Sequence, residues 1–181
     1  MTFYFSVEKL NSFVVSAKTA RYEGQTVGIF PHRPGSIDIQ FWPNFGDFRY
    51  LLSRFGLMRD YVLQEIVYIG DEPVWAMNTY CRLSHDDFSR PRIDDMIDDG
   101  FLKIYKEGRF LGGGEYSSGK YAFLDANQGD VLSFFGKATI TFDGEVAFDI
   151  SYHGGVLVEG WHIKANKYAR SYSLNKSTKQ S

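Results

Sequence analysis

Apolar residues recur at helical spacing in two stretches of the chain. In residues 6–20 the pattern follows Ser6, a good N-cap, and Glu8 lies in the first turn, where the helix dipole favours an acid. In residues 91–107 the same spacing follows Pro91, a favoured residue in the first turn of a helix. The spacing therefore predicts two helices separated by a long intervening segment.

Alternating apolar and polar residues follow each predicted helix and indicate strands. Gly70-Asp71 and Asp143-Gly144 are turn signals between neighbouring strands. Each predicted half is thus a helix followed by an antiparallel meander. The predicted strands span residues 47–55, 60–69 and 73–83 in the first half, and residues 119–125, 131–142 and 146–157 in the second.

The second predicted half repeats the residue pattern of the first. Trp75 and Met77 recur as Phe148 and Ile150, an offset of 73 residues (148 minus 75). Because self-similarity at a fixed offset is typical of repeat architectures, we interpret the chain as an internal duplication. This predicts an α+β fold, with two tandem helix-plus-antiparallel-meander repeats packed into one pseudo-symmetric domain. The halves would form either one continuous sheet or two packed layers.

The predicted helices follow a different offset from the strands. Aligning Phe13 with Phe101 gives 88 residues (101 minus 13) and places Arg21 on Arg109. The first half therefore carries 15 extra residues (88 minus 73), which fall around an inserted loop at residues 29–43. Because loops on a rigid scaffold often carry function, this insertion is a natural place for binding residues.

The repeat sets the expected boundaries within one compact unit. The tail contains lysine and arginine but no acidic residue, and we expect it to fray. The expected segments are a first repeat at residues 1–83, a linker at residues 84–92, a second repeat at residues 93–160 and a basic polar tail at residues 161–181.

Composition narrows the class of protein. The chain has 181 residues and a formal net charge of −2, so no global basic field attracts nucleic acid, and we expect no direct DNA binding. Cys81 is the single cysteine, and no basic segment followed by an apolar stretch opens the chain. No apolar run approaches the roughly 18 residues of a membrane span. These features predict a cytoplasmic protein without a membrane partner.

Residue types found in hydrolytic triads lie together on one predicted strand. Asp149, Ser151 and His153 alternate along it, and neighbours two apart on a strand are roughly 6.8 Å apart, too far for the direct hydrogen bonds of a triad. The histidines lack the spacing of zinc ligands, and the glycine run at residues 112–114 follows a helix instead of opening one. We therefore predict no catalytic constellation, no metal site and no cofactor.

Residues near the end of the first helix and in the inserted loop have the chemistry of a ligand site. Arginine recognises phosphate or carboxylate groups, aromatic rings stack on planar groups, and a short acid accepts hydrogen bonds from hydroxyl or amine groups. The structural alternative is that Arg33 and Asp38 pair with each other and fix the loop. The candidate residues in this cluster are Arg21, Tyr22, His32, Arg33, Ser36 and Asp38.

The repeated strand has a core face and an outward face, because its side chains alternate. Trp75 and Met77 belong to the predicted core face. The outward face and the repeat offer further candidates for ligand binding, and we expect the loop at residues 32–38 to fold over the outward face. These further candidates are Asn78, Tyr80, Arg109 and His153.

Three motifs occur in order along the first half. They are Arg21-Tyr-x-Gly24, Arg33-Pro-Gly-Ser-x-Asp38 and Gly70-x-x-Pro73-Val-Trp75-x-Met77-Asn78-x-Tyr80. Together they resemble a bacterial and phage domain family of unknown function that is often attached to a helix-turn-helix of the XRE type. The resemblance covers roughly residues 6–83 and, as a second copy, residues 93–157. It implies no activity, but attachment to DNA-binding modules suits a sensor of a small molecule.

Three functions fit these observations. The first is a non-enzymatic module that holds a small polar, phosphate-bearing or nucleotide-like ligand between the two halves, including a phage protein that counters host nucleotide signalling. The second is an interaction or inhibitor protein that acts as a homo-oligomer through an exposed aromatic surface. The third is a hydrolase whose site forms only in the fold, from His32, Asp38, Asn78 and His153.

Overall fold

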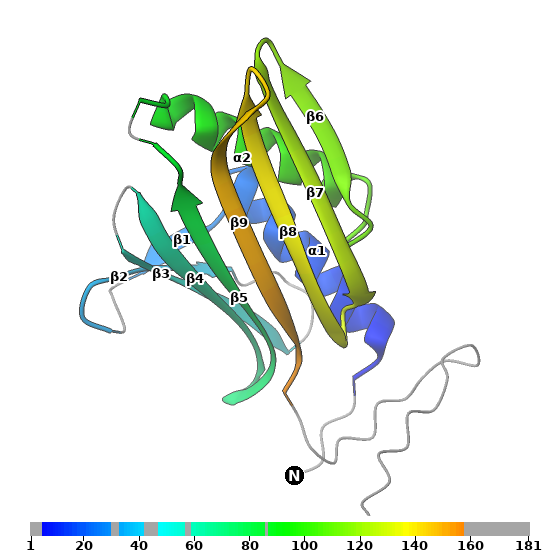
Figure 1. Ribbon diagram of the computed structural model, residues 1–181. Helices are drawn as coiled ribbons and strands as arrows, with labels where there is room; N and C mark the ends of the chain where they lie inside the picture. The colour runs from blue at the N-terminus through cyan, green and yellow to red at the C-terminus, as the bar shows by residue number, and fades with distance from the viewer. Residues whose placement is uncertain (1–4, 30–32, 42–46, 57–58, 86, 158–181) are drawn as a thin grey trace, which may run out of the picture.

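The computed structural model describes residues 5–29, 33–41, 47–56, 59–85 and 87–157 (Figure 1). The predicted tail lies outside the described residues. Helices and antiparallel strands occur in the predicted order, which confirms the α+β class. The described helices are α1 (Val7–Tyr22) and α2 (Arg90–Lys106). The described strands are β1 (Val27–Ile29), β2 (Ser36–Phe41), β3 (Phe48–Gly56), β4 (Asp60–Ile69), β5 (Glu72–Leu83), β6 (Gly114–Ser118), β7 (Tyr121–Asp130), β8 (Ser133–Phe142) and β9 (Glu145–Val156).

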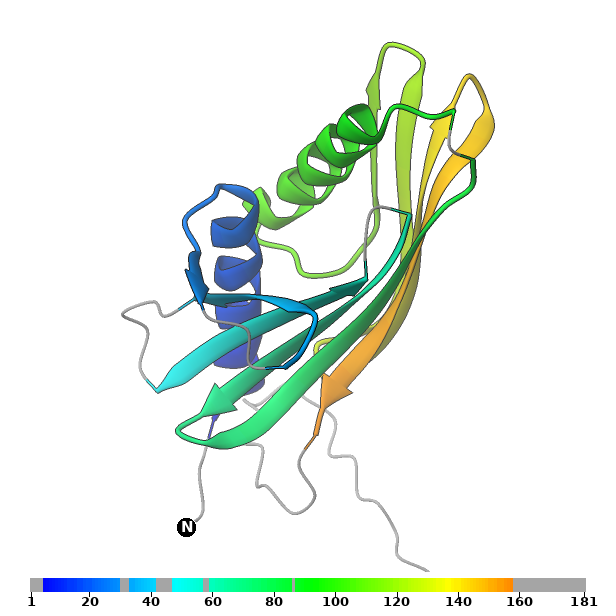
Figure 2. The ribbon, with the colours of Figure 1, turned by 90° about the vertical axis from the view of Figure 1, so that its left-hand side faces the viewer.

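The described strands form one antiparallel sheet of nine strands in the order β1-β2-β3-β4-β5-β9-β8-β7-β6. Each predicted half contributes a continuous meander, and the halves meet where β5 pairs with β9. The sheet is strongly curved, and both helices lie on its concave side (Figure 2). Of the two arrangements that the sequence left open, the structure has the single continuous sheet.

The pairing register of the two meanders is related by the offset of 73 residues found in the sequence. Every residue pair between β3 and β4 has a counterpart between β7 and β8 at this offset. The register shifts after Val67 in β4 and after Ile140 in β8, again 73 residues apart (140 minus 67). Thr79 and Tyr152 obey the same relation and face each other at the middle of the β5–β9 pair. The two meanders therefore meet around this residue pair.

The helices are related by a shorter offset than the aromatic residues suggested. The N-cap residues Ser6 and Ser89 are 83 residues apart (89 minus 6), and most buried positions of α1 have a buried counterpart in α2 at this offset; the exceptions are Val15 and Ala20. Arg21 then corresponds to Ile104, whereas Arg109 lies beyond the end of α2. The predicted match of Arg21 with Arg109 is therefore replaced by one that aligns the caps and buried faces of both helices.

One apolar core fills the space between the helices and the concave face of the sheet. Trp75, Met77, Phe148 and Ile150 are all buried, which confirms the predicted core face of the repeated strand. Trp75 also donates a hydrogen bond from Nε1 to the Val131 carbonyl oxygen at 2.9 Å. The polar edge of this large buried ring is thereby satisfied.

The edge strands β1 and β6 were not predicted. They have 3 and 5 residues, too few for an alternating pattern to stand out from a loop. The residues expected to form an inserted loop contain β2, in which Ile37, Ile39 and Phe41 alternate with polar residues. The inserted residues therefore extend the first half of the sheet instead of forming a separate unit.

Candidate functional site

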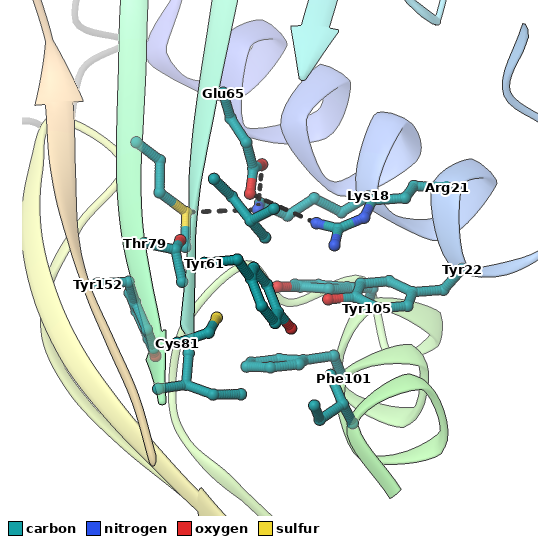
Figure 3. Close-up of a pocket in the computed structure, with 14 residues that line it drawn as sticks. Lys18, Arg21, Tyr22, Tyr61, Glu65, Thr79, Cys81, Phe101, Tyr105 and Tyr152 are labelled. Carbon is teal, nitrogen blue, oxygen red and sulfur yellow. Dashed lines mark hydrogen bonds and ion pairs between the residues drawn. The ribbon is translucent and has the colours of Figure 1, made fainter. Parts of the chain in front are cut away.

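A pocket lies between the two helices and the centre of the sheet, where the two halves meet (Figure 3). The pocket is small and partly open to solvent, with a cavity volume of about 20 Å³. Residues of α1, β4 and β5 line it from the first half, and residues of α2 and β9 line it from the second. The curvature of the sheet therefore places the pocket on the concave face.

A charged cluster is buried at one end of the pocket. Lys18 Nζ lies 2.5 Å from Glu65 Oε2, and the Tyr50 hydroxyl donates to the same oxygen at 2.6 Å. Arg21 Nη1 lies 3.5 Å from the other oxygen, Oε1. Lys18 Nζ also contacts Met77 Sδ at 3.3 Å. Glu65 therefore has two cations and a hydroxyl as partners, as a carboxylate with 1% exposure requires.

The contacts in this cluster set its protonation. Burial opposes ionisation of Glu65, but Lys18 and Arg21 outweigh burial and hold the pKa of Glu65 below its ordinary value. Burial lowers the pKa of Lys18, and the Glu65 carboxylate offsets part of that effect. Because the Lys18 ammonium and the Glu65 carboxylate are in direct contact, the charges of this pair cancel. Burial also opposes the charge of Arg21, yet Tyr22 and Glu65 raise its pKa, so Arg21 carries one further positive charge.

Aromatic rings form the walls of the pocket on the helix side. Tyr22 of α1 stacks on Phe101 and Tyr105 of α2, with ring centroids 6.0 and 5.8 Å apart. The planes of Phe101 and Tyr105 differ by only 8°. In Figure 3 the hydroxyls of Tyr22 and Tyr105 extend from the helices toward the sheet, beside Tyr61. Burial raises the pKa of these three tyrosines, so they are neutral hydroxyls near neutral pH.

Thr79 brings an unpaired hydroxyl to the middle of the pocket. The residue is 4% exposed, and its Oγ1 has no hydrogen-bond partner among the described residues. A buried hydroxyl without a partner costs roughly 1–3 kcal/mol. A ligand atom that bonded to Oγ1 would remove this cost, so Thr79 marks a point at which the pocket favours a polar group.

Tyr152 connects the pocket to a second polar network. Its hydroxyl donates to Asp125 Oδ1 at 2.7 Å, and Asn127 Nδ2 lies 2.7 Å from Asp125 Oδ2. Asn127 Oδ1 in turn accepts a hydrogen bond from the Gly112 N–H at 2.8 Å. Gly136 leaves room for the ring, because a Cβ there would lie 2.3 Å from Tyr152 Cζ. The second half thus fixes the position of one pocket wall.

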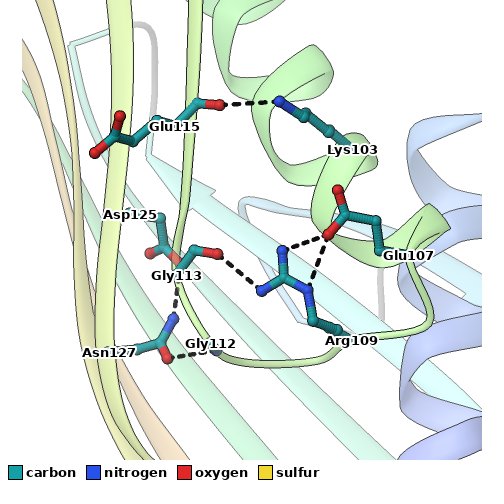
Figure 4. A network of polar contacts seen from close by, with 8 residues as sticks. All are labelled: Lys103, Glu107, Arg109, Gly112, Gly113, Glu115, Asp125 and Asn127. Atoms are coloured by element: carbon teal, nitrogen blue, oxygen red, sulfur yellow. Dashed lines mark hydrogen bonds and ion pairs between the residues drawn. The ribbon is translucent and has the colours of Figure 1, made fainter.

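Arg109, one of the predicted ligand residues, fastens the loop after α2 (Figure 4). Its Nη2 contacts Glu107 Oε2 at 2.5 Å, and its Nη1 donates to the Gly113 carbonyl oxygen at 3.0 Å. Lys103 Nζ adds a contact of 3.3 Å with the carbonyl oxygen of Glu115 in β6. Arg109 does not line the pocket, and its observed contacts are structural.

The predicted cluster in the inserted segment lies near one edge of the sheet. The Ser36 hydroxyl lies 2.8 Å from the Arg33 carbonyl oxygen and 3.0 Å from Asp38 Oδ2. The Arg33 guanidinium lies over the Phe55 ring, 4.7 Å from its centroid. His32 lies outside the described residues. Of the described members of the predicted cluster, only Arg21 and Tyr22 at the end of α1 line the pocket.

Asn78, Tyr80 and His153 lie on the convex face of the sheet. Asn78 and His153 are directly paired across β5 and β9, and Tyr80 is exposed. On the same face the Asp149 carboxylate is engaged by Lys137 Nζ at 2.8 Å. Because strand side chains alternate, these residues point away from the helices and do not line the pocket. The pocket is on the opposite face from the one that the sequence favoured.

The buried charges were missed in the sequence, although a signal for them exists. Lys18 lies in the apolar stripe of α1, eight residues after Leu10. Glu65 lies on the apolar face of β4, between Leu63 and Val67. Buried charged groups are rare unless they are paired. One cation and one anion, each on the apolar face of its element, could therefore have indicated the cluster.

Metal binding, thiol reactivity and membrane insertion were considered for the part of the chain that the structure describes. No group of three or more His, Cys, Asp or Glu side chains there could hold a metal ion. Cys81 is buried, and burial raises the pKa of its thiol to about 11, so it is not a reactive thiolate near neutral pH. No helix in the described ranges is long and apolar enough to cross a membrane.

The fold and the site define an α+β domain in which a curved antiparallel sheet and two helices enclose a polar and aromatic pocket. The chain belongs to the family described as Domain of unknown function (DUF5680), which matches residues 53–157, more than half of its length. No curated protein and no solved structure shows significant similarity to it.

Proposed function

We propose that the protein is a non-enzymatic module that binds a small polar ligand in the pocket between its two halves. The observation that carries this proposal is Thr79, whose buried hydroxyl lies in the pocket without a partner in the described part of the chain. The charged cluster supports it, because buried charges are expensive and cluster at functional sites. The excess positive charge of Arg21 favours a ligand with an anionic group.

An internal duplication is part of this proposal. The common pairing register, the β-bulges at equivalent positions and the two helix caps support it. Because the pocket is centred on the Thr79–Tyr152 pair, where the halves meet, we propose one shared ligand site instead of one site in each half. The charged cluster in the first half makes this shared site asymmetric.

A phosphate-bearing or nucleotide-like ligand is the narrower form of the proposal. Arg21 supplies the cation for an anionic group, and Tyr22 and Phe101 line the pocket with aromatic side chains. A phage protein that sequesters a host signalling nucleotide is one setting for such a module. A sensor attached to a helix-turn-helix of the XRE type in related proteins is another.

Calorimetric titration tests the proposal. The titrants are inorganic phosphate and a panel of linear and cyclic nucleotides, and the proteins are the unaltered chain, Arg21→Gln, Thr79→Val and Arg33→Gln. We expect at least one titrant to bind, with affinity about tenfold lower in Arg21→Gln and about fivefold lower in Thr79→Val. Arg33→Gln is the matched control, because Arg33 lies outside the pocket. Binding that depends on Arg33 and not on Arg21 would contradict the proposed site.

A second candidate function is supported by the convex face. The two described helices lie on the opposite side of the sheet (Figure 2), and the convex face exposes Val62, Tyr80, Leu124 and Phe135, the last with 60% exposure. Contiguous exposed apolar patches mark interaction surfaces, and Val62 and Tyr80 are directly paired across β4 and β5. An interaction or inhibitor protein that acts as a homo-oligomer predicts a sedimentation coefficient above that of a monomer and a shift toward the monomer in Phe135→Ser. A chain that is monomeric at every concentration tested would contradict the homo-oligomer hypothesis.

A further inference from the structure

The pocket between the helices and the sheet has the size of a single water molecule. Its cavity volume is about 20 Å³, and roughly 10–15 Å³ is enough to hold one water. Residues of both helices line it on one side, and residues of β4, β5 and β9 line it on the other (Figure 3). Because the pocket is partly open, water has a route into it from solvent.

Thr79 is the residue in this pocket that most needs a hydrogen-bond partner. It is buried, and its Oγ1 has no partner among the described residues. Met77, two residues earlier on the same face of β5, lines the pocket beside it. Burial of a polar group without a partner is unfavourable, and internal waters typically bond to such groups. Thr79 is therefore the point at which the pocket would hold a water.

Two polar groups of the helices line the pocket together with Thr79. Lys18 Nζ of α1 lies 2.5 Å from Glu65 Oε2 and 3.3 Å from Met77 Sδ. An ammonium group has three donors, so these two contacts leave one donor for a further acceptor. The Tyr105 hydroxyl extends from α2 toward the sheet (Figure 3). A buried water makes about three hydrogen bonds, and the three groups that line the pocket supply that number.

Ser53 of β3 is a buried hydroxyl in a different setting. Its Oγ also lacks a hydrogen-bond partner among the described residues, yet Ser53 does not line the pocket. Thr79 differs from it in having a cavity of the size of a water beside the hydroxyl. Ser53 therefore serves as a control for the effect of removing a buried hydroxyl.

We infer that the pocket holds one ordered water molecule, which is hydrogen-bonded to the Thr79 hydroxyl and to Lys18 or Tyr105. The water links β5 to a helix and satisfies the Thr79 hydroxyl. It is bound without any other ligand, so the inference goes beyond the proposed function. A ligand that enters the pocket displaces this water, and it loses affinity unless one of its polar atoms replaces the hydrogen bond to Thr79.

High-resolution crystal structures of the chain without added ligand test the inference. The proteins are the unaltered chain, Thr79→Ser, which keeps a hydroxyl, and Thr79→Val, which has nearly the same shape without one. We expect one water about 2.5–3.0 Å from the hydroxyl oxygen in the unaltered chain and in Thr79→Ser, and a weaker peak or none in Thr79→Val. A pocket without a water at Thr79, or an equally strong peak in Thr79→Val, would overturn the inference.

Urea denaturation gives an independent test, because the sign of the effect depends on whether the hydroxyl has a partner. Loss of a hydroxyl that bonds to water should destabilise the fold, and we expect the unfolding equilibrium constant of Thr79→Val to rise about fivefold. Ser53→Ala removes an unpartnered hydroxyl and should leave the constant unchanged or lower it. An unchanged or lower constant in Thr79→Val as well would mean that no water satisfies Thr79.

The proposed function is tested separately from the water. Its calorimetric titrations measure the binding of an added ligand, whereas both tests of the water use the chain alone. Failure of every titrant to bind would contradict the proposed function and leave the water in place, and a pocket without a water would do the reverse.

Discussion

The two halves of the molecule fill the space beneath their helices with different chemistry. The first half buries an ion pair and a hydroxyl, whereas the second half has apolar residues that pack edge to face, with the centroids of Phe101 and Phe123 5.0 Å apart. Apolar residues often stabilise a core to the same degree as a buried ion pair. The apolar second half therefore indicates that the fold does not need the buried charges of Lys18 and Glu65. The residues compared are Lys18, Tyr50 and Glu65 with Phe101, Phe123 and Ala138, respectively.

The polar groups of the second half lie at different positions. Tyr152 and Asp125 are hydrogen-bonded at 2.7 Å, whereas the equivalent positions in the first half are Thr79 and Leu52. Tyr152 therefore has protein partners and Thr79 has none among the described residues. The comparison therefore shows one asymmetric pocket, in which Tyr152 is held by hydrogen bonds and the Thr79 hydroxyl has no partner among the described residues.

Removal of one member of the charged cluster should have the largest effect. Glu65→Leu leaves the Lys18 ammonium buried without its partner, and we expect it to lower the free energy of unfolding by about 3–5 kcal/mol. The triple change Lys18→Met, Tyr50→Phe and Glu65→Leu copies the apolar character of the second half and should restore most of the loss. Urea denaturation measures both free energies.

The pair of measurements also tests the comparison itself. If the triple variant is as unstable as Glu65→Leu, the fold needs the charges. The apolar core of the second half then does not show what the first half would tolerate. A stable triple variant that no longer binds ligand would assign the charges to the pocket. Replacement of Lys137 and Asp149 on the convex face is the control, because an exposed pair contributes at most about 1 kcal/mol.

Loss of the Tyr152 hydroxyl should have the next largest effect on the free energy of unfolding. Tyr152→Phe removes the hydroxyl that bonds to Asp125 and leaves a buried carboxylate with fewer partners. We expect a loss of about 1–3 kcal/mol in the free energy of unfolding. Tyr80→Phe, which removes an exposed hydroxyl on the convex face, should change the free energy by less than about 0.5 kcal/mol. Equal losses in both variants would mean that the network does not stabilise the fold.

The helix of the second half contains a glycine at the position where the first has Ala17. A Cβ at Gly100 would lie 2.6 Å from the Phe123 ring, which is 1% exposed. Overpacking should lower the free energy of unfolding by about 1–3 kcal/mol, and the better helix propensity of alanine should raise it by about 1 kcal/mol. We therefore expect Gly100→Ala to lower the free energy of unfolding by about 1 kcal/mol. A thermal melt checks this result. An increase in melting temperature would show that the ring can move.

The smallest effect is a pH dependence from Asp98. Burial raises its pKa to about 6 although Arg21 opposes the shift, and Asp94, Asp99 and Asp95 add to it. Because the folded pKa lies above the unfolded value of 3.8, this stabilisation is fully present below about pH 4 and is lost as the pH rises through 6. Asp98 is exposed to solvent, so the effect should be below about 1 kcal/mol. Urea midpoints at pH 4 and pH 8 should differ less in Asp98→Asn than in the unaltered chain, and an equal difference would contradict the assignment.

Much of the fold could be predicted from local patterns. Period-two alternation located β3, β4 and β5 and their counterparts, because each of these strands has one buried face. The core positions Trp75 and Phe148 followed from the same alternation. The short edge strands and the helix offset could not be predicted, since one depends on sheet pairing and the other on which helix face is buried.

The pocket was harder to predict because it forms on the face that alternation assigns to the core. Asn78 and Tyr80 were chosen for their outward position, yet the curvature of the sheet and the two helices create the pocket on the other side. Lys18 and Glu65 are 47 residues apart and become partners only when α1 packs on β4. Which charged residues meet in a core is a property of tertiary packing, which a linear pattern does not contain.

The most direct test of the account is a methyl nuclear magnetic resonance titration with a library of small anionic and neutral compounds. Ile97, Ile150 and Leu63 report on the pocket, and Val62 and Leu124 report on the convex face. The account predicts that ligands shift the methyl signals of the first three residues and leave those of the last two unchanged. Shifts confined to Val62 and Leu124, or no shift with any compound, would contradict it.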